Sequence, residues 1–420
     1  MLTNPIFYLT NSNTSKASTH SNTNSKSLFN TKREDLQILY KLNQLLIEKS
    51  ILHPYQRILI AVSGGQDSIC LLNILNKLRS TWHWKLGIVH CDHKWYLDSA
   101  LQAIHVSRLA ANMQIDLYQA LTTQSVNNEQ LARNWRYELI RHVAICHNFS
   151  VIVTGHTASD RVETLIYNLI RGSGISGLQS ISWKRKLNSM LTIRMRSVEE
   201  QIILYSKHVK CYQNRENLLE DKKNVDIYLI RPLLNVSRME LKHLVQNWKL
   251  SIWSDCSNQN ISICRNRIRH QLLPYLRQYF HPKIDYVLNS CTEVMYTETL
   301  YLDSIARYVL SKALSFISMP LNDQTCVKLD FELLRAVPLA IQRRILKYFL
   351  DVITHTSVSF KHVEQVRIAC LITTNSSNQF AKDSMNFTDQ LLINRSIYLP
   401  GKKILQVINA RFLIICNNIT

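Results

Sequence analysis

Short apolar runs alternate with stretches of helical periodicity along the first half of the chain. The runs, each short enough to be a buried strand, are Arg57–Val62, Lys85–His90 and Val151–Thr154. The stretches in which apolar residues recur every three or four positions are 36–46, 69–78, 101–113, 131–147 and 161–171. Strands and helices that alternate at this spacing are typical of βαβ units. The pattern therefore predicts an α/β fold with a doubly wound parallel sheet that helices cover on both faces.

The character of the sequence changes on both sides of this region, which predicts three segments: 1–34, 35–280 and 281–420. The first is rich in Ser, Thr and Asn, and its first carboxylate is Glu34, as is typical of a disordered or targeting extension. The second is the α/β domain, with a basic and poorly periodic insertion at 181–225. The third is predicted to be a helical linker followed by a small C-terminal domain, with strand-like runs at 396–399 and 404–407.

The composition of the chain indicates a negatively charged partner. The 420 residues carry a net charge of +20, from 50 Lys and Arg against 30 Asp and Glu. Such a balance favours a polyanion, either nucleic acid or an anionic membrane surface, and the alternative is charge that serves solubility alone. No apolar stretch approaches the roughly 20 residues that span a bilayer. The 10 cysteines include no CxxC pair, which argues against a zinc ribbon, an iron–sulfur site or a disulfide scaffold.

The most specific signal is a loop between the first predicted strand and the next predicted helix: Ser63-Gly64-Gly65-Gln66-Asp67-Ser68. Glycines let the backbone turn tightly and approach a ligand, and a helix N-terminus offers free N–H groups and a positive dipole end. The sequence lacks the GxxxxGK[ST] pattern of the Walker loop. We interpret the loop as a pyrophosphate cradle; the alternative is a tight turn that ends in a serine cap.

A second signal follows the strand at 151–154. Asp160 and Glu163 are three residues apart at the start of a predicted amphipathic helix, so they share one face. At the mouth of a parallel sheet, a carboxylate pair could bind an ammonium group or steer a proton. The residues themselves fit equally well with capping, in which Asp160 is the N-cap and Glu163 is the N3 residue.

A third signal is electrostatic. Residues 256–284 contain no acid, and basic residues alternate there with aromatic ones: Arg265, Arg267, Arg269, Tyr275, Arg277, Tyr279, Phe280 and Lys283. Arginines suit phosphates, and aromatic rings suit exposed bases. The segment therefore favours RNA contact, and the alternative is a solvated basic face on a helix.

The first two signals, the loop at 63–68 and the segment after the strand at 151–154, resemble motifs of known enzymes. The loop at 63–68 resembles the PP-loop of the N-type ATP pyrophosphatases, which cleave ATP between the α and β phosphates and leave AMP on a substrate oxygen. The segment 154–178 resembles the TGHHxDDxxET…RGSG…GL segment of the tRNA(Ile)-lysidine synthetases. It departs at Thr157, where the family has a second His, and at Ser159, where the family has its first Asp.

Further pieces of the same family pattern occur in the same order. Residues 89–93 resemble the HxxHG-type end of the second strand, and 131–137 match an ARxxRY helix. Residues 231–240 match RPLLxxxRxE, and 255–274 match DxSN…RNxIR…LLP. The resemblance covers roughly residues 55–280, and several ordered motifs are more specific than the loop alone.

This resemblance implies a ligase that uses ATP and Mg²⁺ to join lysine to the wobble cytidine of tRNA(Ile) with a CAU anticodon. The cytidine is adenylated first, and the product decodes AUA instead of AUG. The six residues of the loop would hold the pyrophosphate, with Asp67 near Mg²⁺. Asp160 and Glu163 would contact lysine, so the candidate catalytic residues are Asp67, Asp160 and Glu163. The candidate tRNA-binding residues are Arg133, Arg136, Arg171, Arg265, Arg267 and Arg269.

The extension and the AT-rich bias of the composition favour a plastid, with the cytoplasm of a bacterium as the alternative. Two other functions remain open at this point. Another PP-loop enzyme that modifies tRNA, such as a thiolase, would need paired cysteines. A non-catalytic RNA-binding protein would have no need of an intact loop at 63–68.

Overall fold

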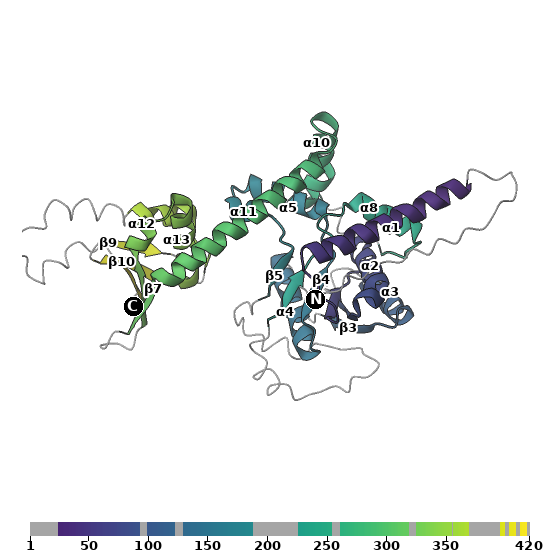
Figure 1. Cartoon of the computed structure of the whole chain (residues 1–420), viewed down its shortest axis with the longest axis horizontal. Helices are drawn as coiled ribbons and strands as arrows, with labels where there is room; N and C mark the ends of the chain where they lie inside the picture. Colours follow the sequence, from purple (N-terminus) through teal and green to yellow (C-terminus); the bar gives the residue numbers. More distant parts are fainter. Residues whose placement is uncertain are drawn as a thin grey trace, which may run out of the picture. The chain divides into compact units, whose positions relative to one another are not determined.

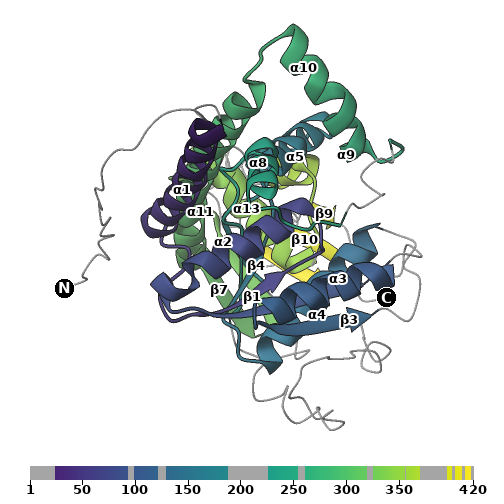
Figure 2. The same ribbon diagram turned by 90° about the vertical axis from the view of Figure 1, so that its right-hand side faces the viewer.

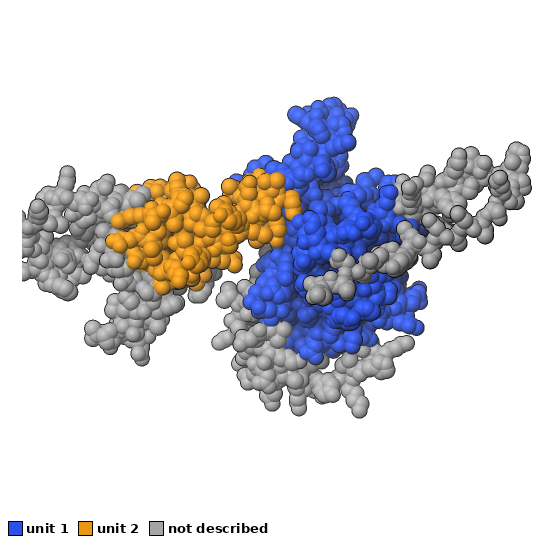
Figure 3. Space-filling view, in the orientation of Figure 1, with its two compact units in different colours: residues 1–173, 180–292 blue, residues 174–179, 293–420 orange. Residues whose placement is uncertain are grey.

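The computed structural model describes ten stretches of the chain: residues 24–92, 99–121, 129–187, 226–253, 261–318, 325–354, 356–368, 395–399, 403–408 and 412–417. The chain divides into two compact units (Figure 3). The first comprises residues 1–173 and 180–292, and the second comprises residues 174–179 and 293–420.

A six-stranded sheet forms the centre of the first unit, in the order β3-β2-β1-β4-β6-β5. Its strands are β1 (Arg57–Ala61), β2 (Lys85–Asp92), β3 (Asp116–Leu121), β4 (Val151–Thr154), β5 (Lys184–Lys186) and β6 (Tyr228–Ile230). All neighbours pair in parallel except β5, which is antiparallel to β6. The predicted doubly wound parallel sheet is confirmed, and β1, β2 and β4 lie where the apolar runs predicted them. The edge strand β3 was not predicted.

The helices of this unit connect and cover the strands (Figures 1 and 2). They are α1 (Asn24–Glu48), α2 (Gln66–Trp82), α3 (Ser99–Asn112), α4 (Glu129–Cys146), α5 (Ala158–Ile170), α8 (Arg238–Asn247), α9 (Cys264–Arg267), the π-helix η2 (Ile268–Leu272) and α10 (Leu273–Tyr279). Helix α1 begins before the boundary predicted at residue 34. Helices α1 and α2 both contact α8.

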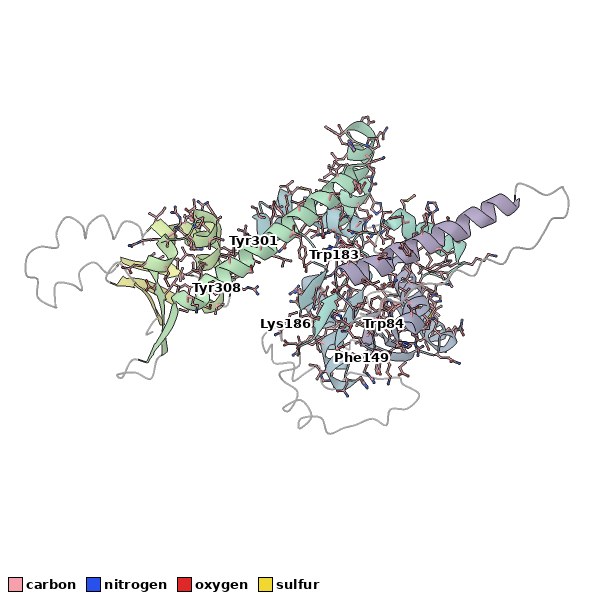
Figure 4. The ribbon with its side chains drawn as sticks, viewed as in Figure 1. Trp84, Phe149, Trp183, Lys186, Tyr301 and Tyr308 are labelled. Atoms are coloured by element: carbon pink, nitrogen blue, oxygen red, sulfur yellow. The ribbon has the colours of Figure 1, made fainter. Side chains whose placement is uncertain are left out.

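The sheet buries apolar side chains on both faces. On one face Leu59 of β1 and Ile152 of β4 pack in a cluster with Leu139 and Val143 of α4. Successive strand residues point to opposite faces, so the equally buried Ile58 and Ile60 serve the other face. Two buried aromatic residues of this unit, Trp84 and Phe149, are labelled in Figure 4. Burial on both faces explains why these strands are nearly continuous apolar runs.

The sheet reverses its winding direction between β1 and β4. Strand β1 pairs with β2 on one side and with β4 on the other, and crevices at such switch points bind ligands in open α/β sheets. The loop after β1 and the segment after β4 meet here. A Cβ atom on Gly155 would lie 3.0 Å from the backbone carbonyl atoms of Asp67. Glycine at 155 therefore allows the start of α5 to approach the start of α2.

The second unit has an antiparallel sheet in the order β7-β8-β11-β10-β9. Its elements are the short helix α6 (Ile175–Leu178), β7 (Leu314–Ser318), β8 (Thr325–Asp330), α12 (Phe331–Arg335), α13 (Leu339–Thr354), β9 (Arg395–Leu399), β10 (Lys403–Ile408) and β11 (Phe412–Asn417). Helix α11 (Ile284–Ala313) runs into this unit from the first and carries the exposed Tyr301 and Tyr308 (Figure 4). The strand-like runs at 396–399 and 404–407 correspond to β9 and β10. Within the described stretches, no helix is long and apolar enough to cross a membrane.

Candidate active site

The loop between β1 and α2 closes on itself through its serines. The backbone N–H of Ser63 donates to Ser68 Oγ at 3.2 Å, and Ser68 Oγ donates to the Gly65 carbonyl at 3.0 Å. Gly64 has φ +88°, a left-handed conformation that favours glycine. Helix α2 begins at Gln66 with no side chain capping its first N–H groups. The loop thus combines a tight turn with an uncapped helix N-terminus, which suits a phosphate group.

Two neighbours hold the outer side of this loop. The side-chain amide of Gln102, on α3, donates to the carbonyl of Ser63. The backbone N–H of Trp253 donates to the Gly64 carbonyl at 2.9 Å. A Cβ atom on Gly64 would come within 3.2 Å of the Gln102 side chain. The loop conformation is therefore fixed by two neighbouring segments besides its own hydrogen bonds.

Helix α5 positions the two carboxylates on the other side of the switch point. Its N-cap is Thr157, which is fully buried and forms a capping box with Asp160 as the N3 residue. Asp160 Oδ2 accepts hydrogen bonds from the Thr157 backbone N–H and hydroxyl, both at 2.9 Å. The alternative that Asp160 is the N-cap and Glu163 the N3 residue is therefore wrong. Asp160 does take part in the cap, but from the N3 position, three residues after the N-cap, and it uses only Oδ2 for this.

Arg238, the first residue of α8, joins all three candidate carboxylates. Its guanidinium donates from Nε to Asp67 Oδ2 at 3.3 Å, from Nη2 to Asp160 Oδ1 at 3.0 Å and from Nη1 to Glu163 Oε1 at 3.2 Å. The side chain of Glu163 is only 1% exposed. One side chain therefore connects the phosphate loop with the acid pair of α5.

Two more arginines reach the acid pair from the helical segment that follows. Arg269 donates to both oxygens of Glu163, at 2.7 and 2.8 Å. Arg265 donates to Glu163 Oε2 at 3.2 Å and lies 3.4 Å from Asp160 Oδ1. Arg267, between them, is exposed. The backbone widens into a π-helix at 268–272, two residues before Pro274, and a proline ring clashes with the carbonyl four residues back. Such π-helical turns are frequent at functional sites.

Backbone contacts fix the start of α8 between the two motifs. The side-chain amide of Gln66 donates to the Arg238 carbonyl at 3.1 Å, and the Arg238 N–H donates to Ser159 Oγ at 3.3 Å. Ser237 caps α8 in a capping box with Glu240. Gln66 is one of the residues predicted to bind ATP. Its side chain holds the backbone of Arg238, and its backbone N–H lies at the start of α2.

The electrostatics of the cluster follow from burial and these ion pairs. Burial would raise the pKa of Asp160, but Arg238 and Arg265 outweigh it and hold the pKa below its usual value. Burial raises the pKa of Asp67 despite the neighbouring Arg238. The pKa of Arg238 lies above its usual value because the three carboxylates outweigh its burial. Asp160 therefore stays ionised at neutral pH and suits the binding of a cation better than the removal of a proton.

Comparison with known proteins adds to this geometry. Residues 34–276 match the sequence profile of a family described as the PP-loop domain. The chain is 43% identical to the chloroplastic tRNA(Ile)-lysidine synthase of Staurastrum punctulatum, over 82% of this chain and 76% of the relative. It is 35% identical to the tRNA(Ile)-lysidine synthase of Nostoc sp., over 82% of this chain and 91% of the relative. The chain belongs to the tRNA(Ile)-lysidine synthase family.

Two further comparisons complete this picture. The chloroplastic tRNA(Ile)-lysidine synthase of Nephroselmis olivacea is 32% identical, over 75% of this chain and 76% of the relative. Among solved structures, the U34-tRNA thiolase NcsA of Methanococcus maripaludis gives a TM-score of 0.46 at 14% identity, over 63% of this chain and 79% of the thiolase. A structural similarity this low does not distinguish a lysidine synthase from a thiolase.

The two departures from the pattern of the tRNA(Ile)-lysidine synthases have local physical explanations. Thr157 stands where the family has a second His, and its hydroxyl both accepts from the Asp160 N–H at 3.3 Å and donates to Asp160 Oδ2. Threonine is a favourable N-cap. Ser159 stands where the family has an Asp, and its hydroxyl accepts a hydrogen bond from Arg238. Both substitutions leave Asp160 and Glu163 in place.

The structure separates the other arginines that the sequence associated with tRNA. Arg133, on α4, donates to the Tyr137 hydroxyl at 3.2 Å and stacks on its ring, and Arg136 is exposed on the same helix. Arg171 is exposed at the C-cap of α5 and stacks on Tyr167. It is eleven residues from Asp160, or about 16 Å along a helix. Arg171 therefore lies apart from the acid pair.

Arg231, Arg238 and His156 lie within the motifs at 231–240 and 154–178, but the sequence predicted no role for them. Arg231, buried at the end of β6, donates to the carbonyl of Ser182 at 2.6 Å. His156 hydrogen-bonds with the Thr154 hydroxyl at 2.9 Å, and burial lowers its pKa. Their place in the RPLLxxxRxE and TGHHxDDxxET patterns was the available signal. Residues 254–260, which include the predicted DxSN match, lie outside the described residues.

Proposed function

We propose that this chain ligates lysine to the wobble cytidine of tRNA(Ile) with a CAU anticodon, with ATP as the source of activation. The observation that carries this proposal is the juxtaposition of the phosphate loop at 63–68 with the carboxylate pair of Asp160 and Glu163, joined by Arg238 at 3.0–3.3 Å. Membership of the tRNA(Ile)-lysidine synthase family supports a carbon–nitrogen ligase that acts on tRNA(Ile).

The loop supplies the site for the phosphates of ATP. Gly64 permits the turn, and α2 directs its first N–H groups to the departing pyrophosphate. Ser63 and Ser68 add hydroxyl groups, which are 3.2 Å apart. The Asp67 carboxylate at the start of α2 fits a hard cation, because within the described part of the chain its Oδ1 has a single contact, with the Gln66 amide at 3.4 Å. Mg²⁺ at Asp67 would neutralise charge on the pyrophosphate.

The reaction proceeds in two displacements. The C2 oxygen of the cytidine attacks the α-phosphorus of ATP, the bond to the bridging oxygen breaks, and pyrophosphate leaves. The side-chain amine of lysine then attacks C2, loses a proton, and expels AMP with the former C2 oxygen. The protein contributes positioning and charge stabilisation, because both substrates must meet at the mouth of the sheet.

Asp160 and Glu163 bind the side-chain ammonium of lysine, which loses a proton before its nitrogen attacks C2. Glu163 is almost completely buried and Asp160 stays ionised, so the pair offers fixed negative charge in a site of low dielectric. A hydrogen bond between charged partners contributes about 1.5–3 kcal/mol. The pair therefore selects an amino acid with a cationic side chain over neutral ones.

The tRNA contacts the basic and aromatic surface of the helices after the site. On α10, Tyr275 and Tyr279 are exposed with ring centroids 4.8 Å apart, and Phe280 follows at 69% exposure. Arg267 is exposed on the preceding helix. Exposed rings beside arginine suit stacking on unpaired bases and contact with phosphates. Arg136 and Arg171 extend the same role to α4 and α5.

Two alternatives have less support. A thiolase would act through thiolates, but burial raises the pKa of the Cys70 and Cys91 thiols to about 12. A non-catalytic RNA-binding protein gains nothing from the cluster of Asp67, Asp160 and Glu163 beside an intact phosphate loop.

The chloroplastic relatives support action in a plastid. The cyanobacterial relative in Nostoc keeps a bacterial cytoplasm as the alternative. Fractionation of the source cells distinguishes these two locations, because a plastid protein co-fractionates with stromal markers.

The direct test of function is incubation of the full chain with ATP, labelled lysine and unmodified tRNA(Ile) that carries CAU. We expect labelled tRNA, formation of AMP, and ATP–pyrophosphate exchange that requires the tRNA. The same tRNA with GAU has guanosine at the wobble position and should give none of the three. Exchange without tRNA, or labelling of the GAU form, would contradict the proposed substrate.

A further inference from the structure

Every oxygen of the acid pair already has protein donors. Asp160 Oδ1 is within 3.0–3.5 Å of three arginines, and Oδ2 accepts twice from Thr157. Glu163 Oε1 accepts from Arg238 and Arg269, and Oε2 accepts from Arg265 and Arg269. A carboxylate offers about four lone-pair sites, so both groups are saturated. An ammonium group can enter only if one of these arginines leaves.

Arg238 is the arginine of these three that also donates to Asp67 of the phosphate loop. Arg269 donates two short hydrogen bonds to Glu163, of 2.7 and 2.8 Å. Arg238 instead spreads single contacts of 3.0–3.3 Å over three different carboxylates. One of these is Asp67, which belongs to the phosphate loop. A guanidinium fork matches phosphate oxygens as well as it matches a carboxylate.

The net charge of the cluster also favours the binding of a nucleotide before lysine. Asp67, Asp160 and Glu163 carry three negative charges, and Arg238, Arg265 and Arg269 carry three positive charges, so the cluster is neutral. Lysine alone would add an uncompensated positive charge to partly buried groups, which is unfavourable. A nucleotide in the loop supplies the missing negative charge.

We propose that Arg238 exchanges partners, binding the phosphates of ATP when the nucleotide is present and so freeing Asp160 and Glu163 for lysine. This inference rests on the proposed function and adds an order of binding to it: ATP first, then lysine. The backbone of Arg238 need not move, because Gln66 and Ser159 hold it between the two motifs. Only its side chain turns from the carboxylates to the loop.

Such an exchange makes the two ligands cooperative. ATP should tighten lysine binding by a factor in the usual range for coupled sites, about 5- to 150-fold, and lysine should tighten ATP binding equally. Arg238→Gln removes the competing cation. Its lysine affinity without nucleotide should therefore rise above that of the wild type, while the dependence on nucleotide should disappear. A residue that merely supports the fold would lower affinity in both conditions.

The experiment is equilibrium dialysis of labelled lysine against the full chain, with and without α,β-methylene-ATP, a non-cleavable analogue. Wild type, Arg238→Gln and Arg238→Lys are compared. Arg343→Gln is the matched control, because Arg343 forms a 2.7 Å ion pair with Glu364 in the second unit. The control should keep the wild-type coupling. Arg238→Lys keeps the charge without the fork, and its coupling should be weaker than that of the wild type.

Equal lysine affinity with and without the analogue in the wild type would overturn the exchange, whatever the variants do. So would Arg238→Gln with unchanged coupling. These outcomes are distinct from failure of the proposed function. If the wild type forms lysidine but shows no coupling, only the partner exchange is wrong. If it forms no lysidine and binds no lysine even with the analogue, the proposed function itself is wrong.

Discussion

Replacement of Glu163 by Gln tests the acid pair most sharply, because the amide keeps the shape of the side chain and removes only its charge. Glu163 is 1% exposed and lies within 3.2 Å of nitrogen atoms on Arg238, Arg265 and Arg269. Neutralising it leaves three guanidinium groups with two carboxylates. Breaking a buried ion pair costs about 3–5 kcal/mol of stability, and the partly exposed arginines place this case near the lower end. At about 2–4 °C per kcal/mol, we expect Tm to fall by about 6–12 °C.

The same substitution should raise the lysine KM. Loss of one charge-assisted hydrogen bond costs about 1.5–3 kcal/mol, or about ten- to a hundredfold. The ATP KM should change less, because the loop at 63–68 belongs to a different element. Steady-state lysidine formation below the Tm of the variant measures both constants.

Glu364→Gln provides the matched control in the second unit. Glu364 pairs with Arg343 at 2.7 Å and with Arg367 at 2.8 Å. Its loss should leave the lysine KM unchanged. If folded Glu163→Gln keeps the wild-type lysine KM, Glu163 has only a structural role and lysine must bind elsewhere.

Four further predictions address single parts of the site. Asp67→Ala should abolish tRNA-dependent ATP–pyrophosphate exchange without a large loss of Tm, and wild-type turnover would refute the role of the loop. Gly155→Ala should raise the ATP KM, because the new Cβ would lie 3.0 Å from the backbone of Asp67 and displace the start of α2; an unchanged KM would show that the segments can separate freely. Arg267→Ala should reduce the slope of log tRNA affinity against log salt by roughly 0.7–0.9, whereas Arg269→Ala should mainly impair lysine binding; identical effects would contradict this division. The pKa of Asp160 is lowered in the folded state, so its contribution to stability is present above its unfolded pKa of about 3.9 and is lost as pH falls through the folded pKa. Urea titrations from pH 2 to 6 should therefore show that the free energy of unfolding of Asp160→Asn falls less steeply toward low pH than that of the wild type.

The strands that the sequence predicted are those buried on both faces. The runs at 57–62 and 151–154 contain nearly all apolar residues because β1 and β4 lie in the middle of the sheet. Strand β3 (Asp116–Leu121) lies at the edge and includes the polar residues Asp116 and Gln119, which interrupt the apolar run. Three-residue strands such as β6 are too short for any periodicity. Local pattern therefore revealed the centre of the fold and missed its edges.

The same limit applies to the site. The phosphate loop could be found from sequence because its chemistry is contained in six consecutive residues. The role of Arg238 could not, because its partners Asp67, Asp160 and Glu163 lie 171, 78 and 75 positions away along the chain. No periodicity connects residues at such separations. Only the topology of the sheet, which places β1 next to β4, brings them together.

The capping role of Asp160 and the ligand role that we propose for it use different atoms of one carboxylate. Oδ2 faces Thr157 and completes the helix cap, while Oδ1 faces the arginines. The cap fixes the carboxylate plane, so Oδ1 cannot rotate away when an arginine leaves. A threonine at 157 serves this purpose with a hydroxyl that both donates and accepts, which a single neutral imidazole nitrogen cannot do. In the proposed exchange the capping bonds therefore support the function, because they hold in place the oxygen of Asp160 that Arg238 would release to lysine.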